Sequence, residues 1–159
     1  MNVIIVDDEP LALDVMEAHI SRMPELSLVA RCTNAFEANE ALKTHEVDLM
    51  FLDIQMPQLT GIEFLKTLKN PPMVIFTTAY QQYAIEGFEL NALDYLLKPI
   101  SMDRFMKAVN KATDQYQLHH KEVVATPSAD SIAVGTEGGN TDYIYVKSDK
   151  KLIRVNFYT

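Results

Sequence analysis

The sequence predicts an α/β domain built on an open, doubly wound sheet of five parallel strands. Three features of the sequence support this prediction. Five short apolar runs have the continuous hydrophobicity of strands buried on both faces, segments with helical spacing follow them, and strand and helix alternate within the first 120 residues. This alternation favours right-handed crossovers and an open sheet rather than a barrel of eight units.

The first strand is expected at residues 3–6, and the helix after it carries Pro10 near its start. The broad apolar face expected for this helix comprises Leu11, Val15, Met16, His19, Ile20 and Met23. The second strand is expected at residues 26–30, close to the only cysteine, Cys32. A lone cysteine makes no internal disulfide, and here it suits a small buried side chain.

Asn34 is a candidate N-cap for the second helix. The inward face of that helix is expected to comprise Ala38, Ala41, Leu42 and His45. The third strand is expected at residues 49–52, and the third helix begins near Gly61 with Ile62, Leu65 and Leu68 on its apolar face. Two consecutive prolines at residues 71–72 stop this helix.

The fourth strand, expected at residues 73–77, is followed by a weak helix at residues 82–89. Gly87 lies inside that helix and costs about 1 kcal/mol there, so this is the element expected to move. The fifth strand is expected at residues 95–97. The last helix begins after Ser101 and is the most regular, with Phe105, Val109, Ala112 and Tyr116 at helical intervals.

The remaining residues differ in composition from the first 120. Residues 121–141 are expected to form a linker, because residues 125–140 are rich in Thr, Ser, Gly and Ala and have little hydrophobic periodicity. Residues 142–159 alternate in polarity around a turn at 148–151 and predict a β-hairpin. The open edges of an isolated hairpin invite pairing with a second chain, which would give a homodimer.

The composition, with 48% hydrophobic and 23% charged residues, is that of a soluble globular protein. The formal net charge is -8, and the excess of acids over bases lies entirely in the first 120 residues. An acidic surface repels phosphate backbones, which argues against nucleic-acid binding by this part alone. No apolar run is long enough to cross a bilayer and the N-terminus does not resemble a signal peptide, so the protein is expected in the cytoplasm.

Polar residues stand at the carboxyl ends of the expected strands. Asp7 and Asp8 follow the first strand, Asp53 the third, Thr78 the fourth and Lys98 the fifth. Ligands bind at this edge in doubly wound sheets, so these side chains should converge. Three carboxylates this close raise one another's pKa unless a cation joins them, and hard oxygen ligands favour Mg²⁺. A carboxylate beside such an ion can attack a phosphoryl group, whose other oxygens Lys98 and Thr78 would hold.

Each of these residues also has a simpler explanation. The acids at residues 7–9 match a helix macrodipole, Asp53 suits a turn, Thr78 suits a helix cap and Lys98 suits a solvated surface. Those explanations do not anticipate the joint placement of these residues at the ends of four strands. The histidines show no metal-ligand spacing, and the eight methionines suit core packing.

Four motifs in residues 1–120 resemble those of the receiver domains of two-component response regulators. The motifs are Asp7-Asp8-Glu9-Pro10, the run at residues 51–57 with Gly61, the run at residues 76–80, and the run at residues 94–99. They occur in order and with family-like spacing. The resemblance implies a flavodoxin-like fold with the strand order 2-1-3-4-5.

The resemblance also implies roles for single residues. Asp53 would be the phosphoacceptor. Asp7 or Asp8, together with Asp53 and the backbone carbonyl of Gln55, would bind Mg²⁺. Lys98 would contact the phosphoryl group, and such a receiver would be a phosphoacceptor switch rather than an enzyme.

A second set of residues would carry the signal. Thr78 and Tyr95 would form a switch pair, in which the hydroxyl moves to the phosphoryl oxygen and the ring turns inward. The side chains of Gln55 and Tyr80 would tune the lifetime of the phosphorylated form. The peptide bond between Lys98 and Pro99 would be cis, which aims the ammonium at the site.

The tail at residues 142–155 resembles the opening of a LytTR-type DNA-binding domain. The resemblance implies a regulator of the LytR/AlgR type, with a receiver domain at residues 1–120, a linker at 121–141 and the beginning of the DNA-binding domain at 142–159. Its partners would be a sensor histidine kinase and, through a domain that continues beyond Thr159, promoter DNA.

Two other functions stay open. A phosphatase of the haloacid-dehalogenase type also uses a strand-end aspartate and Mg²⁺, but it needs a second acid two residues after its nucleophile, where this chain has Gln55. A stand-alone receiver would serve as a phosphorelay shuttle or interaction module. The hairpin-like tail argues against that function.

Overall fold

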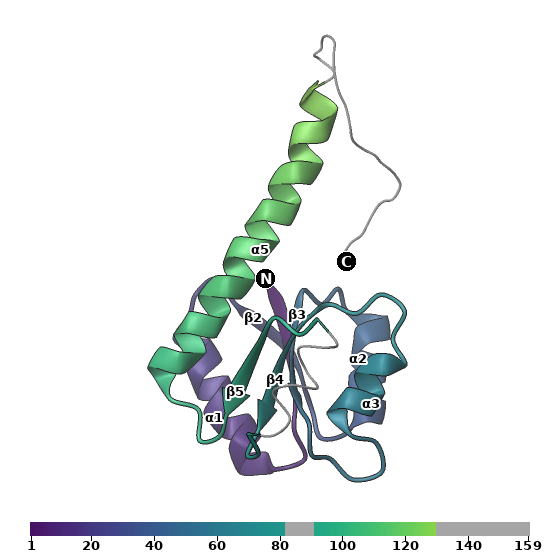
Figure 1. The fold of residues 1–159 in the computed structure, drawn as a ribbon, viewed down its shortest axis with the longest axis vertical. Helices are drawn as coiled ribbons and strands as arrows, with labels where there is room; N and C mark the ends of the chain where they lie inside the picture. The colour runs from purple at the N-terminus through teal and green to yellow at the C-terminus, as the bar shows by residue number, and fades with distance from the viewer. Residues whose placement is uncertain (82–90, 130–159) are drawn as a thin grey trace. The chain divides into compact units, whose positions relative to one another are not determined.

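The computed structural model describes residues 1–81 and 91–129 and shows the predicted alternation of strands and helices (Figure 1). The elements are β1 (Asn2–Val6), α1 (Pro10–Ser21), β2 (Ser27–Cys32), α2 (Ala35–Thr44), β3 (Leu49–Asp53), α3 (Gly61–Lys66), β4 (Met73–Thr78), β5 (Asp94–Leu97) and α5 (Met102–Ala129). The weak helix expected at residues 82–89 and the hairpin expected at residues 142–159 lie outside the described residues.

The five strands form one parallel sheet in the order β2-β1-β3-β4-β5, which confirms the predicted strand order. In the register of the sheet, Asp53 pairs with Thr77 and Thr78 pairs with Leu97. The strand order reverses at β1, which lies between β2 and β3. The carboxyl ends of β1, β3, β4 and β5 therefore lie beside one another at the edge where such sheets bind ligands.

The side chains on the two faces of the sheet form separate hydrophobic clusters. Along β1, Val3 and Ile5 belong to the cluster under α1 and α5, whereas Ile4 and Val6 belong to the cluster under α2 and α3 (Figure 1). None of these four side chains is more than 1% exposed. Successive side chains of a strand point to opposite faces, so a strand covered on both sides must be apolar throughout.

Local sequence signals fix the starts of the helices. Asn34 caps α2, because its side-chain oxygen accepts a hydrogen bond from the Glu37 N–H at 2.9 Å. At the start of α3, the Thr60 hydroxyl accepts from the Glu63 N–H at 3.1 Å, and the Glu63 carboxylate accepts from the Thr60 N–H at 3.0 Å. This capping box starts α3 at Gly61, directly beside the end of β3.

The face predicted for α1 is wrong at two positions. Leu11 is 78% exposed and Val15 is 45% exposed, whereas Leu13, Met16 and Ile20 are buried. Because each helical residue turns by about 100°, Leu11 points about 160° away from Leu13, and both cannot face the sheet. The inward placement expected for His45 is also wrong: it lies just after the last residue of α2 and is exposed.

The last helix is longer than the sequence indicated. α5 extends to Ala129, past residue 121, where the linker was expected to begin. Residues 121–125 contain neither glycine nor proline, and Lys, Glu and Ala favour the helical state. The chain divides into two compact units within this helix, the first being Met1–Thr113. Among the helices of residues 1–81 and 91–129, none combines the length and the apolar character that a membrane span requires.

Candidate functional site

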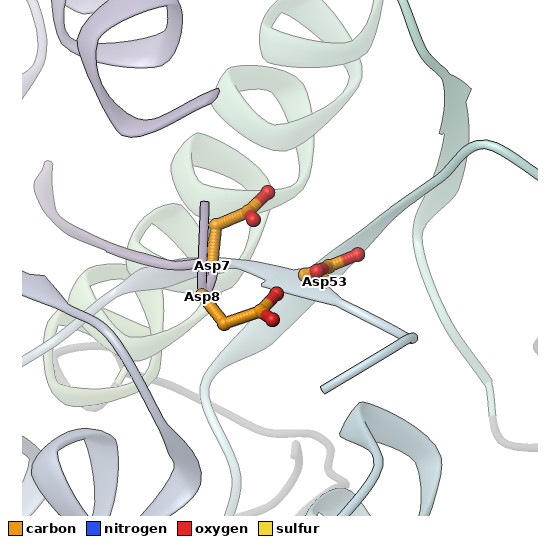
Figure 2. Close-up of side chains that lie close together, drawn as sticks. All are labelled: Asp7, Asp8 and Asp53. Carbon is orange, nitrogen blue, oxygen red and sulfur yellow. The ribbon is translucent and has the colours of Figure 1, made fainter. Parts of the chain in front are cut away.

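Three aspartates come together at the carboxyl edge of the sheet. Asp7 and Asp8 directly follow β1, and Asp53 is the last residue of β3. Each offers one carboxylate oxygen, and the three oxygens lie within 4.8 Å of one another (Figure 2). Asp7 is 4% exposed and Asp53 is 2% exposed, whereas Asp8 is exposed. Two buried acids therefore share a site with a third that water reaches.

Main-chain hydrogen bonds hold the segments that carry these aspartates. The Asp7 N–H donates to the carbonyl oxygen of Cys32 at 3.0 Å, and the Asp7 carboxylate accepts from the Glu9 N–H at 3.0 Å. After Asp53, the Ile54 N–H donates to the carbonyl oxygen of Thr77 at 3.1 Å. The carboxylates are thus positioned by the edge of the sheet itself.

Gly61 lies against the backbone of Asp53. Its N–H donates to the carbonyl oxygen of Ile54 at 2.9 Å. A Cβ atom at this position would overlap with the carbonyl oxygen of Asp53 and lie 3.0 Å from the carbonyl carbon. Only glycine permits this close approach between the start of α3 and the end of β3.

Lys98, which follows β5, brings an ammonium group into the cluster. Its Nζ lies 2.8 Å from Oδ2 of Asp7, 3.4 Å from Oδ1 of Asp53 and 3.4 Å from Oε1 of Glu9. The peptide bond between Lys98 and Pro99 is cis, as expected. One cation therefore contacts both buried aspartates.

The environment shifts the pKa of both Asp53 and Lys98. Burial raises the pKa of Asp53 to about 8, and the charge of Asp7 adds to this effect while Lys98 opposes it. Burial opposes the charge of Lys98, but its hydrogen bond with Asp7 and the charges of Asp53, Asp7 and Glu9 outweigh burial and raise its pKa. Further positive charge beside the Asp53 carboxylate would favour its ionised form.

The donor set fits a divalent cation with hard oxygen ligands. Mg²⁺ binds oxygen ligands at about 2.1 Å in an octahedral arrangement, in which adjacent ligand atoms lie about 3 Å apart. The three carboxylate oxygens lie within 4.8 Å of one another, so the side chains would move inward to hold one ion. The exposure of Asp8 leaves access for the water ligands that Mg²⁺ usually keeps. Asp7, Asp8 and Asp53 are therefore the residues that would hold the ion.

The other predicted site residues come from the neighbouring strand ends. Thr78 ends β4 and is 1% exposed, and its hydroxyl accepts from the Tyr80 N–H at 2.9 Å. Tyr80 is 48% exposed. The ring of Tyr95 in β5 packs on Phe76, with 5.5 Å between the ring centroids. Gln55 is exposed just after β3. The roles expected for these residues stay predictions.

Comparison with known proteins agrees with this geometry. The family model described as the response regulator receiver domain matches residues 3–110. This chain belongs to the response regulator receiver family. The matched range of the receiver contains the three clustered aspartates and Lys98.

Curated relatives match the receiver and, in one case, nearly all of the remaining residues. The sensory transduction protein LytT of Enterococcus faecalis is 34% identical over 158 residues, which cover 98% of this chain and 65% of LytT. The transcriptional regulatory protein BtsR of Escherichia coli is 40% identical over 111 residues, which cover 69% of this chain and 46% of BtsR. The chain thus spans about half to two thirds of the length of these relatives.

Solved structures match the receiver fold. The response regulatory domain of protein mrkE from Klebsiella pneumoniae gives a TM-score of 0.68 at 32% identity and covers 74% of this chain and 99% of that domain. The REC domain of AraT from Geobacillus stearothermophilus gives 0.66 at 30% identity and covers 75% of this chain and 97% of that domain.

One feature of the receiver was not among the predicted site residues. Asp94, the first residue of β5, is buried and forms ion pairs with Arg104 and Lys111 of α5. The signal that could have indicated it is the spacing of the two cations, which stand seven residues apart and so share one face of the helix.

Proposed function

We propose that Asp53 accepts a phosphoryl group from a sensor histidine kinase and that phosphorylation controls a LytTR-type DNA-binding transcription regulator. The observation that carries the proposal is the grouping of Asp7, Asp8 and Asp53, with Nζ of Lys98 3.4 Å from an oxygen of Asp53. A nucleophile, the ligands for Mg²⁺ and a cation for the phosphoryl oxygens therefore share one small site.

In the transfer, a carboxylate oxygen of Asp53 forms a bond to phosphorus while the bond from phosphorus to the donor nitrogen breaks. When bound, Mg²⁺ offsets the negative charge of the carboxylate and of the phosphoryl group. Asp7 and Glu9 hold Lys98 beside Asp53 until a phosphoryl oxygen offers the ammonium a new partner. The same site would later admit the water that hydrolyses the acyl phosphate.

Thr78 and Tyr95 would convert phosphorylation into a change of shape. Thr77 pairs with Asp53 in the sheet, so Thr78 stands one residue beyond the phosphoacceptor on the adjacent strand. Its hydroxyl would leave the backbone of Tyr80 for a phosphoryl oxygen, and the ring of Tyr95 would turn into the space left.

Gln55 and Tyr80 would act on the phosphorylation site in different ways. The backbone carbonyl of Gln55 would complete the protein ligands of Mg²⁺. The side chains of both residues are exposed and would control the access of water to the phosphorus. They would thereby set the lifetime of phosphorylated Asp53.

The relatives support the proposed output. LytT is named a sensory transduction protein and BtsR a transcriptional regulatory protein. Since the first 120 residues carry all the excess negative charge, promoter DNA would be bound by a C-terminal domain of the LytTR type, beginning at residues 142–159. Kinase and receiver would meet in the cytoplasm.

Incubation with Mg²⁺ and a small phosphodonor such as acetyl phosphate tests the assignment of Asp53. Intact mass spectrometry is expected to show one added phosphoryl group on the wild-type chain and none on Asp53→Asn, which lacks the nucleophile. Asp14→Asn removes the same charge from an exposed position of α1 and should be phosphorylated like the wild type. An equal mass increase in the Asp53→Asn variant would refute the assignment.

A gel-shift titration against promoter DNA tests the output. The chain of 159 residues is expected to show no sequence-selective binding, whereas a longer protein carrying the complete DNA-binding domain is expected to bind selectively. Tight, selective binding by the present chain alone would contradict this division of roles.

A further inference from the structure

An ion pair between the buried Asp94 and the partly exposed Arg104 joins β5 to α5 beside the aromatic residue of the proposed switch. Asp94 is 5% exposed. The guanidinium of Arg104 binds its carboxylate through two nitrogens, with Nη1 3.0 Å from Oδ2 and Nη2 2.7 Å from Oδ1. A bidentate pair of this kind combines strength with a fixed direction, so Arg104 is held in one orientation.

The same pair binds both backbone polar groups of Tyr95. The Tyr95 N–H donates to Oδ1 of Asp94 at 2.7 Å, and the Tyr95 carbonyl oxygen accepts from Nη2 of Arg104 at 3.0 Å. One nitrogen of Arg104 therefore donates to Asp94 and to Tyr95 at once. In addition to the pairing of β5 with β4, this ion pair holds the Tyr95 backbone at the edge of the sheet.

The Tyr95 backbone carries a ring that packs on the neighbouring strand. The ring of Tyr95 packs on Phe76 at an interplanar angle of 38°. Phe76 is 0% exposed and stands two residues before Thr78 on β4. Because Phe76 is enclosed, a displaced Tyr95 backbone would change the contact between the rings rather than carry Phe76 with it.

We propose that Arg104 is a positioning residue for the switch, because by fixing the backbone of Tyr95 it sets how readily the ring turns when Asp53 is phosphorylated. This inference rests on the proposed function. The role belongs to the planar fork and not to charge alone: a lysine would neutralise Asp94, but its compact ammonium does not reproduce the paired, planar donors of a guanidinium.

Lys111 offers a comparison within the same network. Its Nζ lies 3.3 Å from Oδ2 of Asp94, which is not the oxygen that accepts from the Tyr95 N–H. Its side chain is 52% exposed, compared with 38% for Arg104, and its single contact with Asp94 contributes less than the bidentate contact of the guanidinium. Removing Lys111 should therefore reduce the positive charge around Asp94 and leave the Tyr95 backbone in place.

Fluorine NMR of the full chain labelled with 3-fluorotyrosine follows the ring of Tyr95 directly, and Tyr95→Phe assigns its signal. Spectra without additions and with Mg²⁺ and beryllium fluoride define the full wild-type displacement. Without additions, the signal of Arg104→Lys is expected at least about one third of the way to the beryllium fluoride position, because a looser backbone lowers the free-energy gap between the ring states. The Tyr95 signal of Lys111→Met is expected to move by less than about one tenth of that displacement.

A Tyr95 signal in Arg104→Lys that coincides with the wild type, or that moves no more than in Lys111→Met, would overturn the inference. Urea denaturation measures stability separately, and a loss of stability without displacement of the signal would show a merely structural role and equally overturn it. Should Arg104→Lys fail to fold, Asp94→Asn replaces it: the amide oxygen still accepts from the Tyr95 N–H, and the expected displacement is the same.

Intact mass spectrometry separates this inference from the proposed function. If the wild-type chain takes up no phosphoryl group, both the proposed function and the role of Arg104 are refuted. Normal phosphorylation of the wild type and of Arg104→Lys, with an undisplaced Tyr95 signal in the variant, removes this inference alone.

Discussion

Replacing Gly61 by alanine is expected to displace the end of β3, although Gly61 carries no functional group. The added Cβ would overlap with the carbonyl oxygen of Asp53 and lie 3.1 Å from Cγ of Leu52. A side chain could rotate away, but the carbonyl belongs to a residue that pairs with Thr77 of β4. Relief of the overlap therefore requires α3 or the strand itself to move.

The size of the effect depends on two opposing contributions. Overpacking costs about 1–3 kcal/mol, and the upper part of this range applies because backbone must move. Alanine also restricts the unfolded chain, which stabilises the fold by about 0.4–1 kcal/mol. The free energy of unfolding should therefore fall by about 2 kcal/mol, which lowers the melting temperature by roughly 8 °C for a domain of this size.

Urea denaturation measures the change in free energy, and intact mass spectrometry measures the rate of phosphorylation of Asp53 in the folded variant. Both quantities are expected to fall. Ala18→Ser, which adds one atom at an exposed position of α1, is the matched control and should change the free energy by less than about 0.5 kcal/mol. Wild-type stability and rate in Gly61→Ala would show that the Cβ fits and would refute the reasoning.

Three further predictions concern single side chains. Burial opposes ionisation of Asp94, but the hydrogen bonds from Arg104 and from the backbone, with the nearby cations, outweigh it and lower its pKa below the ordinary value of 3.8. A lowered carboxyl pKa stabilises the fold above the unfolded value and ceases to do so as the pH falls through the folded value, so urea titrations should show the stability loss of Asp94→Asn in full at about pH 6 and reduced below about pH 3. A pH-independent loss would contradict this. Burial raises the pKa of Cys32 from 9.0 to about 11. Its alkylation by iodoacetamide at about pH 8 should therefore be roughly 100-fold slower in the folded than in the urea-unfolded chain, and equal rates by intact mass would count against the buried thiol. In the Tyr80→Ala variant, the acyl phosphate on Asp53 should be hydrolysed faster, because the substitution removes a ring that shields the phosphorus. Unchanged or slower release of phosphate would argue against that role.

The strand positions could be predicted because a parallel strand covered on both faces needs an uninterrupted apolar run. β1, β3, β4 and β5 begin and end within one residue of the expected ranges. β2 ends two residues later than expected, at Cys32. The order of the strands came from the family resemblance, since periodicity indicates strands but not which of them are neighbours.

The orientation of a helix is harder to predict than its existence. Leu11 and Val15 are apolar and stand at helical spacing from other apolar residues, yet they are exposed. Only the packing of α1 on the sheet decides which stripe of an apolar-rich helix is buried. The end of α5 was missed for a related reason, because composition changes before helical propensity is lost.

The carboxylate cluster could be predicted because parallel strands bring their carboxyl ends to one edge. The contact of Glu9 with Lys98 was not predicted, since an acid at the start of α1 already had a sufficient explanation in the helix macrodipole. The pairing of Asp94 with Arg104 was not predicted either. The spacing of Arg104 and Lys111 places both cations on one face of α5, but it does not show that this face turns toward β5.

The division of the core by the sheet has a consequence for how substitutions combine. Tyr95 packs against the cluster under α2 and α3, whereas Leu96 and Phe105 belong to the cluster under α1 and α5. Since the strand backbones lie between them, a cavity made in one cluster removes contacts from that cluster alone, and the free-energy costs of substitutions on opposite faces should add. One cluster can therefore accept substitutions, or repack around the ring of Tyr95, while the other cluster continues to stabilise the sheet.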